Sequence, residues 1–365
     1  MKAADPATIE TPVGYLDLSR VRANARRVAA YADGHGLRWR PHIKTHKSLA
    51  VARIQLEAGA SGLTVATLRE AEVMATLTPD ILLAYPPVGV AKLERLLALP
   101  RELDLKVALD APEVLAPLAA AAAASGRTVG VLVELDVGLG RVGVRTDADL
   151  VRVAEGAASG RGVAFRGILF YPGHIRGPRE SQSSPVAQVA ERLRAALDAL
   201  GAAGLEPEIV SGGSTPTLWD SHLMTGLTEI RSGSCIFFDR EALDVGVASA
   251  EDLAYTVLTT VVSTAVPGHA VVDAGSKALA KEGRGGDGFG VVFEHPEVVV
   301  RSLSEEHGVL DLGATTWRPT IGERVRIVPN HVCVSVNLQD ALLARDGEAH
   351  RMLTLDARGR GPWTA

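Results

Sequence analysis

The segment RPHIKTHK, residues 40–47, places two lysines and two histidines within eight residues. Such a run of nitrogen bases could bind nucleic acid, hold a metal ion or surround a catalytic lysine. The chain as a whole has a net charge of −5, so it produces no general positive field that would attract a polyanion. We therefore expect no nucleic-acid partner, and two interpretations stay open for the segment, a metal site and a reactive lysine.

Two glycine-rich loops offer backbone N–H groups that could hold a phosphate. They are SGGSTP, residues 211–216, and RSGS, residues 231–234. Each follows an apolar, strand-like run, and an ordinary turn explains each one alone equally well. Together with Lys44, whose amine could form a Schiff base, they suggest the cofactor pyridoxal 5'-phosphate (PLP). The alternative for Lys44 is a surface lysine at the end of a strand.

Two further strand-like runs end in ionisable or aromatic side chains. VELDVGLGRVGV carries Glu134, Asp136 and Arg141, and FYPGH carries Tyr171 and His174. These groups could act on a cofactor or a substrate. Buried acids at such positions could equally form structural salt bridges, and a histidine beside a Pro-Gly pair could be an ordinary loop residue.

The pair His331 and Cys333 in the motif PNHVC could hold a metal ion. The surrounding residues look strand-like, and in a strand residues i and i+2 project from the same face. An imidazole and a thiolate together favour zinc, or Mn²⁺ or Co²⁺ if oxygen ligands complete the coordination shell. The commoner origin of such a pair is a buried cysteine beside a turn histidine.

The elements that must position these residues alternate between apolar, β-branched runs and amphipathic runs rich in Ala and Leu. The strand-like runs are 37–44, 61–67, 81–89, 103–111, 128–138, 163–173, 206–216 and 228–238. Runs that are apolar on both faces suit a parallel sheet covered by helices. The pattern predicts an α/β fold, a (β/α)8 TIM barrel, with a doubly wound open sheet as the alternative.

The barrel prediction gives the chemical motifs a common location. In this fold the reacting groups lie at the carboxyl ends of the strands, and phosphate sites commonly follow the seventh and eighth strands. The two glycine-rich loops follow these two strands, and Lys44 falls at the end of the first. Partial desolvation in the barrel mouth would favour the neutral, nucleophilic form of its amine.

The chain changes character after residue 251. It becomes strand-rich, with Pro-Gly and Gly-rich breaks and no long helical period, which predicts a mainly-β domain. We place the barrel at residues 1–248 and a C-terminal β domain with the metal ligands at residues 249–365. The early strand-like segment TPVGYLDL, residues 11–18, could pair with either domain.

The composition limits the class of protein. Hydrophobic residues make up 47% of the chain and aromatic residues 4%, so a large, mostly aliphatic core is expected. Two cysteines cannot form a disulfide framework, which favours a reducing compartment. The N-terminus lacks an apolar signal region, and no apolar span of roughly 18 residues occurs. We expect a cytoplasmic protein that does not bind membranes.

Six motifs together resemble the D-threonine aldolase/D-serine dehydratase family, the metal-activated branch of the fold-type III PLP enzymes, a class that includes alanine racemase. They are RPHIKTHK, VELDVGLGRVGV, SGGSTPT, TEIRSGSCIFFD, DAGSKAL and PNHVCVSVN, and the resemblance covers residues 10–345. It implies an alanine racemase-like fold, in which a PLP-binding barrel carries a C-terminal β domain.

The resemblance also implies roles for individual residues. Lys44 would be the Schiff-base lysine, Arg141 would lie beside the cofactor phenolate oxygen, and Arg231 would face the pyridine nitrogen. The other residues predicted to bind the cofactor are Tyr171, Ser211, Gly212, Gly213, Ser214, Gly233 and Ser234. Supporting positions are expected for His42, Thr45, His46 and Lys47. His331 and Cys333 would be the metal ligands.

The implied activity is PLP- and divalent-metal-dependent cleavage of a D-β-hydroxy-α-amino acid to glycine and an aldehyde, as in a D-threonine aldolase. His174 is the predicted base for the hydroxyl proton. The alternative is a D-serine or D-threo-3-hydroxyaspartate dehydratase that gives a keto acid and ammonia, in which Lys44 would remove the Cα proton. Cys333 leaves this choice open, because some D-threonine aldolases carry aspartate at this place whereas the dehydratases carry cysteine.

Two other functions fit the sequence less well. An amino-acid racemase would have no use for the PNHVC motif, and a non-enzymatic PLP-binding protein with a lone barrel would lack the β domain. The expected partner is a small D-amino acid, and analogy with the enzyme class also suggests a homodimer.

Overall fold

The computed structural model describes residues 7–283 and 287–361, which divide into two compact units. One unit combines the chain up to Ala25 with Ser234–Asp356, and the other combines Arg26–Gly233 with the chain from Ala357. The transition therefore falls at Ser234, earlier than the boundary that the sequence suggests after residue 248. The C-terminal tail belongs with the barrel unit, because Ala357 N–H donates to the carbonyl of Lys47 at 2.9 Å.

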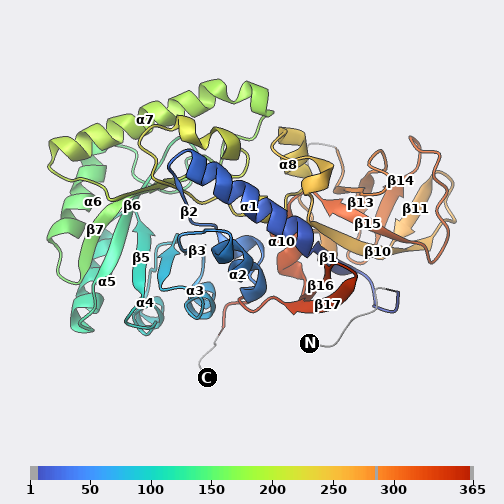
Figure 1. The fold of residues 1–365 in the computed structure, drawn as a ribbon, viewed down its shortest axis with the longest axis horizontal. Coiled ribbons are helices and arrows are strands. Elements are labelled where there is room, and N and C mark those ends of the chain that lie inside the picture. Colours follow the sequence, from blue (N-terminus) through green and yellow to red (C-terminus); the bar gives the residue numbers. More distant parts are fainter. Residues whose placement is uncertain (1–6, 284–286, 362–365) are drawn as a thin grey trace. The chain divides into compact units, whose positions relative to one another are not determined.

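The barrel unit contains one parallel sheet of eight strands (Figure 1). In sheet order they are β2 (Arg38–Trp39), β9 (Glu229–Ile230), β8 (Ile209–Gly212), β7 (Val163–Phe170), β6 (Val129–Leu135), β5 (Asp104–Leu109), β4 (Asp80–Leu83) and β3 (Leu63–Val65). A parallel bridge between His42 and Thr64 joins the β2 edge to β3. The sheet is therefore closed, which confirms the predicted (β/α)8 barrel and excludes the open sheet.

Helices follow the strands as predicted and lie outside them in Figure 1. They are α2 (Leu49–Glu57), α3 (Leu68–Met74), α4 (Val90–Leu97), α5 (Pro112–Ala124), α6 (Asp147–Ser159) and α7 (Ser183–Ala202). Three 3₁₀ helices accompany them, η1 (Ile43–Thr45), η2 (Arg179–Ser181) and η3 (Leu218–Leu223), and α1 (Leu18–Gly34) runs from one unit into the other. Within the described chain η3 is the helical element between β8 and β9, so this connection has no regular α-helix.

The barrel core has an apolar layer and a charged layer. Five neighbouring strands each contribute one buried side chain to the apolar cluster, namely Leu82, Ala108, Leu132, Leu169 and Ile209. The charged layer joins Glu229 to Arg40, Arg40 to Asp80, and Asp80 to Lys106. Arg40, Lys106 and Glu229 are each at most 1% exposed, so these charges depend on one another for compensation.

The second unit is mainly β, as predicted, and contains a sheet of nine strands. They are β1 (Val13–Asp17), β10 (Tyr255–Ser263), β11 (His269–Val272), β12 (Gly290–Val292), β13 (Val300–Leu303), β14 (Gly308–Asp311), β15 (Arg324–Pro329), β16 (Ala341–Asp346) and β17 (Ala349–Thr354). The early segment forms β1, which pairs antiparallel with β10 and parallel with β16.

Short helices connect the strands of this unit. They are η4 (Ser234–Ile236), α8 (Arg240–Val245), η5 (Ala250–Asp252), α9 (Ser276–Leu279) and α10 (Val332–Leu338). In the part of the chain that the structure describes, no helix is long and apolar enough to cross a membrane.

The strand predicted around His331 and Cys333 is wrong. His331 is the N-cap of α10, and Cys333 lies in the first turn of that helix. The run VCVSV alternates as a strand would, but Val332 and Val336, one helical turn apart, are both fully buried. The carboxylate of Asp239, distant in sequence, accepts the N–H of Val332 at 2.9 Å and so helps the helix to start.

Candidate cofactor and metal sites

Lys44 lies beyond the end of a barrel strand, and not on the strand itself. The strand β2 ends at Trp39, Pro41 follows, and Lys44 occupies the 3₁₀ helix η1. The N-cap residue His42 accepts the N–H of Lys44 through its side chain, Nδ1 to N at 3.5 Å. The side chain of Lys44 is exposed, so the expected desolvation is not seen in this chain by itself.

The histidines of this segment are held in the neutral form. Burial, and then the nearby charges of Lys44 and Arg231, set the pKa of His42 well below its usual value. Burial also lowers the pKa of His46 to about 4. His46 Nδ1 accepts the N–H of Ser48 at 3.1 Å, so its Nε2 carries the proton and donates to Gln55 Oε1 at 3.0 Å. Both rings therefore shape the turn that presents Lys44.

A second group of predicted residues gathers around Tyr171, which follows β7. The Lys44 amine lies 6.0 Å from the centroid of the Tyr171 ring, and the Arg141 guanidinium carbon lies 5.1 Å from it. Arg141 Nη2 is 3.8 Å from Glu134 Oε1 at the end of β6. Burial raises the pKa of Glu134, although Arg231 and Arg141 act in the opposite direction. The structure thus brings these side chains to the carboxyl ends of the barrel strands.

Arg231 is buried just after β9, and two neighbouring strands fix its orientation. Its Nη1 donates to Ser211 Oγ at 2.8 Å, and its Nη2 donates to the carbonyl of Phe170 at 2.7 Å. Ser211 Oγ in turn donates to Glu229 Oε1 at 2.7 Å. Burial lowers the pKa of Arg231 to about 10, so the guanidinium stays protonated at neutral pH. Ser211, predicted to line the phosphate loop, connects Arg231 to the charged layer of the barrel.

The two glycine-rich loops lie side by side. Ser232 Oγ donates to the carbonyl of Ser214 at 2.8 Å, and Arg231 N–H donates to the carbonyl of Gly212 at 3.0 Å. Gly213 has φ +84°, which an L-residue rarely adopts. A Cβ at Gly233 would lie 2.4 Å from the carbonyl oxygen of His42. These glycines permit the close backbone approach that a phosphate cradle needs. Ser234 begins η4 in the other unit.

His174 lies in the turn after β7 and is exposed. Its Cε1 and Nε2 atoms would be 3.2 Å from a Cβ at Gly138, so the ring packs against the loop after β6. The loop after β6 also carries Arg141, and the turn that contains His174 directly follows Tyr171. The predicted base therefore belongs to the same group of loops as Lys44 and Arg141.

The barrel residues fit PLP by their chemistry. An accessible lysine amine could attach the aldehyde, and two adjacent loops with little side-chain bulk suit a phosphate. A buried guanidinium just after β9 suits the ring nitrogen that the family resemblance implies for Arg231. The fit therefore rests on the types of donor and on the loops that carry them.

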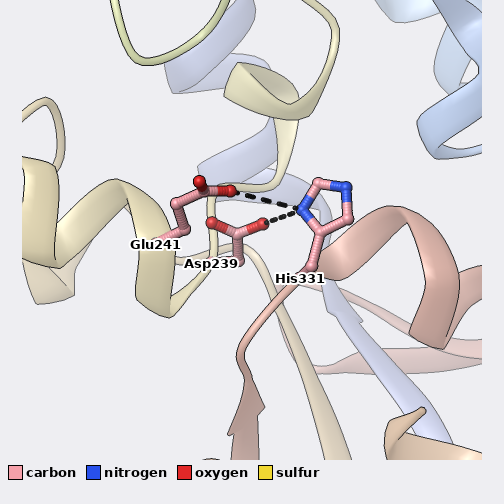
Figure 2. A group of neighbouring side chains, drawn as sticks. All are labelled: Asp239, Glu241 and His331. Atoms are coloured by element: carbon pink, nitrogen blue, oxygen red, sulfur yellow. Dashed lines mark hydrogen bonds and ion pairs between the residues drawn. The ribbon is translucent and has the colours of Figure 1, made fainter. Parts of the chain in front are cut away.

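A group of side chains that could hold a metal ion lies in the β unit. Asp239, Glu241 and His331 each offer one ligand atom, and these atoms lie within 4.8 Å of one another. Figure 2 shows both carboxylates approaching the same ring nitrogen, with Asp239 Oδ2 3.1 Å and Glu241 Oε2 3.7 Å from His331 Nδ1. Burial opposes protonation of His331, but Cys333, which also hydrogen-bonds to it, and Asp239 act in the opposite direction and raise its pKa.

The sequence prediction names His331 and Cys333 and does not name Asp239 or Glu241. These two flank the start of α8 and are about 90 residues from His331 in the chain, so spacing could not reveal them. The one available signal was the run FFDRE after the eighth strand, which placed two acids near a strand end.

Two domain families match the chain. Alanine racemase, N-terminal domain, matches residues 16–241, and the putative serine dehydratase domain matches residues 254–344. The chain is 37% identical to D-threo-3-hydroxyaspartate dehydratase of Delftia sp. (strain HT23), over 90% of this chain and 92% of that protein. It is 33% identical to D-threonine aldolase of Arthrobacter sp., over 97% and 94% of the two chains.

The chain belongs to the D-threonine aldolase/D-serine dehydratase family.

Solved structures of this family agree with the fold. D-threonine aldolase from Filomicrobium marinum matches with a TM-score of 0.90 at 30% identity, covering 98% of this chain and 99% of that one. A cysteine-to-alanine variant of a D-threo-3-hydroxyaspartate dehydratase, in a metal-free form, matches with a TM-score of 0.87 at 32% identity, covering 97% and 99%. The resemblance carried by the six motifs is thereby confirmed, whereas the roles of individual residues stay predictions.

Proposed function

We propose that this protein is a PLP- and divalent-metal-dependent lyase of the D-threonine aldolase type. It cleaves the Cα–Cβ bond of D-β-hydroxy-α-amino acids and yields glycine and an aldehyde. The observation that carries the proposal is full-length similarity to a D-threonine aldolase, combined with Lys44, Tyr171 and Arg141 gathered at the carboxyl ends of the barrel strands.

The barrel residues would hold the cofactor. When bound, PLP supplies an electron sink for the negative charge that develops at Cα. Lys44 would attach it, and the loops at Gly212–Ser214 and Ser232–Ser234 would bind its phosphate. Arg231 would face the ring nitrogen as a protonated guanidinium, and since it does not readily give up its proton, the ring would stay unprotonated. Such a weak electron sink suits a reaction that also relies on a metal.

The reacting hydroxyl needs a group that takes its proton. His174 Nε2 would accept this proton while the Cα–Cβ bond breaks and its electron pair stays on Cα. A proton delivered to Cα then gives glycine, and the β-carbon leaves as the aldehyde. His331 and Cys333 would hold the divalent cation, Mn²⁺, Zn²⁺ or Co²⁺, whose charge lowers the pKa of a bound hydroxyl.

A dehydratase is the second candidate, and two observations favour it. The chain is 37% identical to D-threo-3-hydroxyaspartate dehydratase, and it carries Cys333, as the dehydratases do. In that reaction Lys44 would remove the Cα proton, the hydroxyl would leave, and a keto acid and ammonia would form. Racemisation remains the less favoured alternative.

Product analysis distinguishes these candidates. The purified protein, supplied with PLP and Mn²⁺, is incubated with D-threonine, and glycine and 2-oxobutyrate are each quantified. The proposal predicts glycine and acetaldehyde in equal amounts. L-Threonine, supplied in a parallel incubation, should not react. 2-Oxobutyrate as the main product would refute the aldolase and support the dehydratase.

A homodimer and a cytoplasmic location also remain proposals. Light scattering of the holoenzyme would test the first, and cell fractionation would test the second.

A further inference from the structure

Asp239 is the buried centre of a small hydrogen-bond network in the β unit, 3% exposed. Its Oδ1 accepts the N–H of Ala242 at 3.1 Å and so caps α8. Its Oδ2 accepts the N–H of Val332 at 2.9 Å at the start of α10 and lies 3.1 Å from His331 Nδ1. Two backbone amides from two helices therefore fix the carboxylate before the histidine is considered.

The fixed carboxylate determines the protonation of the His331 ring. An oxygen that already accepts the N–H of Val332 acts as an acceptor toward Nδ1, so Nδ1 must carry a proton. When the ring is neutral, as it must be to bind a metal ion, its lone pair is on Nε2, which Figure 2 shows on the side of the ring away from both carboxylates. A metal ion binds a lone pair, so this arrangement leaves Nε2 as the nitrogen that can ligate.

We propose that Asp239 is a positioning residue that locks His331 in the Nδ1–H form and thereby commits Nε2, together with Cys333, to the metal. The inference rests on the metal dependence in the proposed function. Its physical basis is general, because carboxylates that bind the second nitrogen of a ligating histidine fix the tautomer and the orientation of the ring. Asp239 would thus couple the folding of α8 and α10 to the shape of the metal site.

A competing arrangement uses the same three residues differently. Asp239, Glu241 and Nδ1 could chelate the ion directly, since their ligand atoms lie within 4.8 Å of one another. In that case Asp239 and Glu241 would be equivalent ligands and Cys333 would have no role. The separation of 3.7 Å between Glu241 Oε2 and His331 Nδ1 exceeds a hydrogen bond, whereas Asp239 lies within one.

Asp239→Asn is the informative change, with Glu241→Gln as its matched control. Asparagine caps helices well, so α8 keeps its cap. Its NH₂ group would take the place of Oδ2, so the N–H of Val332 would lose its acceptor. The same NH₂ would face His331 as a donor, which reverses the hydrogen bond and moves the ring proton to Nε2. We expect the affinity for Co²⁺ to fall about 10–100-fold in Asp239→Asn and to stay near that of wild type in Glu241→Gln.

The assay titrates metal-free holoenzyme with Co²⁺ and follows the thiolate-to-cobalt charge-transfer absorption, which Cys333→Ser should abolish. Wild-type affinity in Asp239→Asn would overturn the proposal. So would equal losses in Asp239→Asn and Glu241→Gln with no thiolate band, because Asp239 would then be a ligand.

A second measurement needs no metal and separates the failure of this inference from that of the proposed function. Two-bond ¹⁵N–¹H NMR of ¹⁵N-histidine-labelled, metal-free protein is assigned with His331→Gln and recorded at a pH at which the ring is neutral. The single ring proton should be on Nδ1 in wild type and on Nε2 in Asp239→Asn. An Nε2–H ring in the wild type would refute the role of Asp239. An Nδ1–H ring in a protein that binds no Co²⁺ would support that role and refute the proposed metal dependence.

Discussion

Replacing Glu229 by glutamine should destabilise the barrel strongly, because this carboxylate compensates two buried guanidinium groups. Glu229 is fully buried, and both of its oxygens lie 3.0 Å from Arg40 Nε. Ser211 Oγ also donates to it at 2.7 Å, which connects it to Arg231. Glutamine keeps the shape of the side chain but removes its charge and places an NH₂ group against one of these donors.

The magnitude follows from the burial of the pair. Removing one partner of a buried ion pair costs about 3–5 kcal/mol, since the remaining charge is left uncompensated. Arg40 keeps its ion pair with Asp80, so the lower part of that range is expected. The matched control is Glu208→Gln. Glu208 makes a bidentate pair with Arg166 at 2.6 and 2.9 Å, but its side chain is 58% exposed. An exposed pair contributes only about 0–1 kcal/mol.

Urea unfolding followed by far-UV circular dichroism measures both variants against wild type at one PLP concentration. Glu229→Gln should lower the free energy of unfolding by about 3 kcal/mol, and Glu208→Gln should lower it by less than about 1 kcal/mol. Equally small decreases in the free energy of unfolding of the two variants would refute the reasoning, because burial of the ion pair would then not determine how much stability is lost with the charge.

Six further substitutions test other parts of the account. His331→Ala and Cys333→Ala should each remove most metal-dependent turnover, whereas the amount of bound PLP, measured by absorbance, should not change. Cys333→Asp should have a smaller effect and should shift the metal preference from zinc toward manganese, which activity measured with each metal would show. Gly233→Ala should lower PLP affinity in a spectroscopic titration, because its Cβ would lie 2.4 Å from the carbonyl oxygen of His42. Arg231→Glu should lower turnover by reversing the charge at the ring nitrogen, and unchanged kcat would contradict that placement. Folded His46 has a pKa of about 4, so only the unfolded chain takes up a proton below pH of about 6.5. The free energy of unfolding should therefore be highest above that pH and should fall by up to about 3 kcal/mol as the pH drops toward 4. His46→Gln should reduce this pH dependence, which urea unfolding midpoints measured at several pH values would show.

The strand pattern of the barrel could be predicted because strands that are buried on both faces consist of continuous apolar runs. All seven residues of β6, VGVLVEL, are buried, and the other apolar runs likewise contain the strands where they were expected. The connection after β8 differs, since Gly212, Gly213 and Pro216 favour a loop that ends in the 3₁₀ helix η3. Lys44 lies past its strand for a related reason. Pro41 lacks an N–H, and the chain turns into η1 soon after it.

The candidate metal site could be predicted only in part. The pair His331 and Cys333 was visible as a motif, but its secondary structure was not, because alternation in VCVSV fits a strand as well as a short helix with one buried side. The deciding contact is the carboxylate of Asp239 at the N-terminus of α10. A contact over this sequence distance leaves no trace in the local pattern, so neither the helix nor the orientation of the His331 ring could be derived from one sequence.

The attachment point of the cofactor tests the central claim most directly. Holoenzyme is reduced with borohydride, digested and mapped by mass spectrometry, with Lys44→Ala treated in parallel. The account predicts a pyridoxyl group on Lys44 in the wild type and no labelled lysine in the variant. A label on Lys47 or Lys277, or a label that survives in Lys44→Ala, would contradict it.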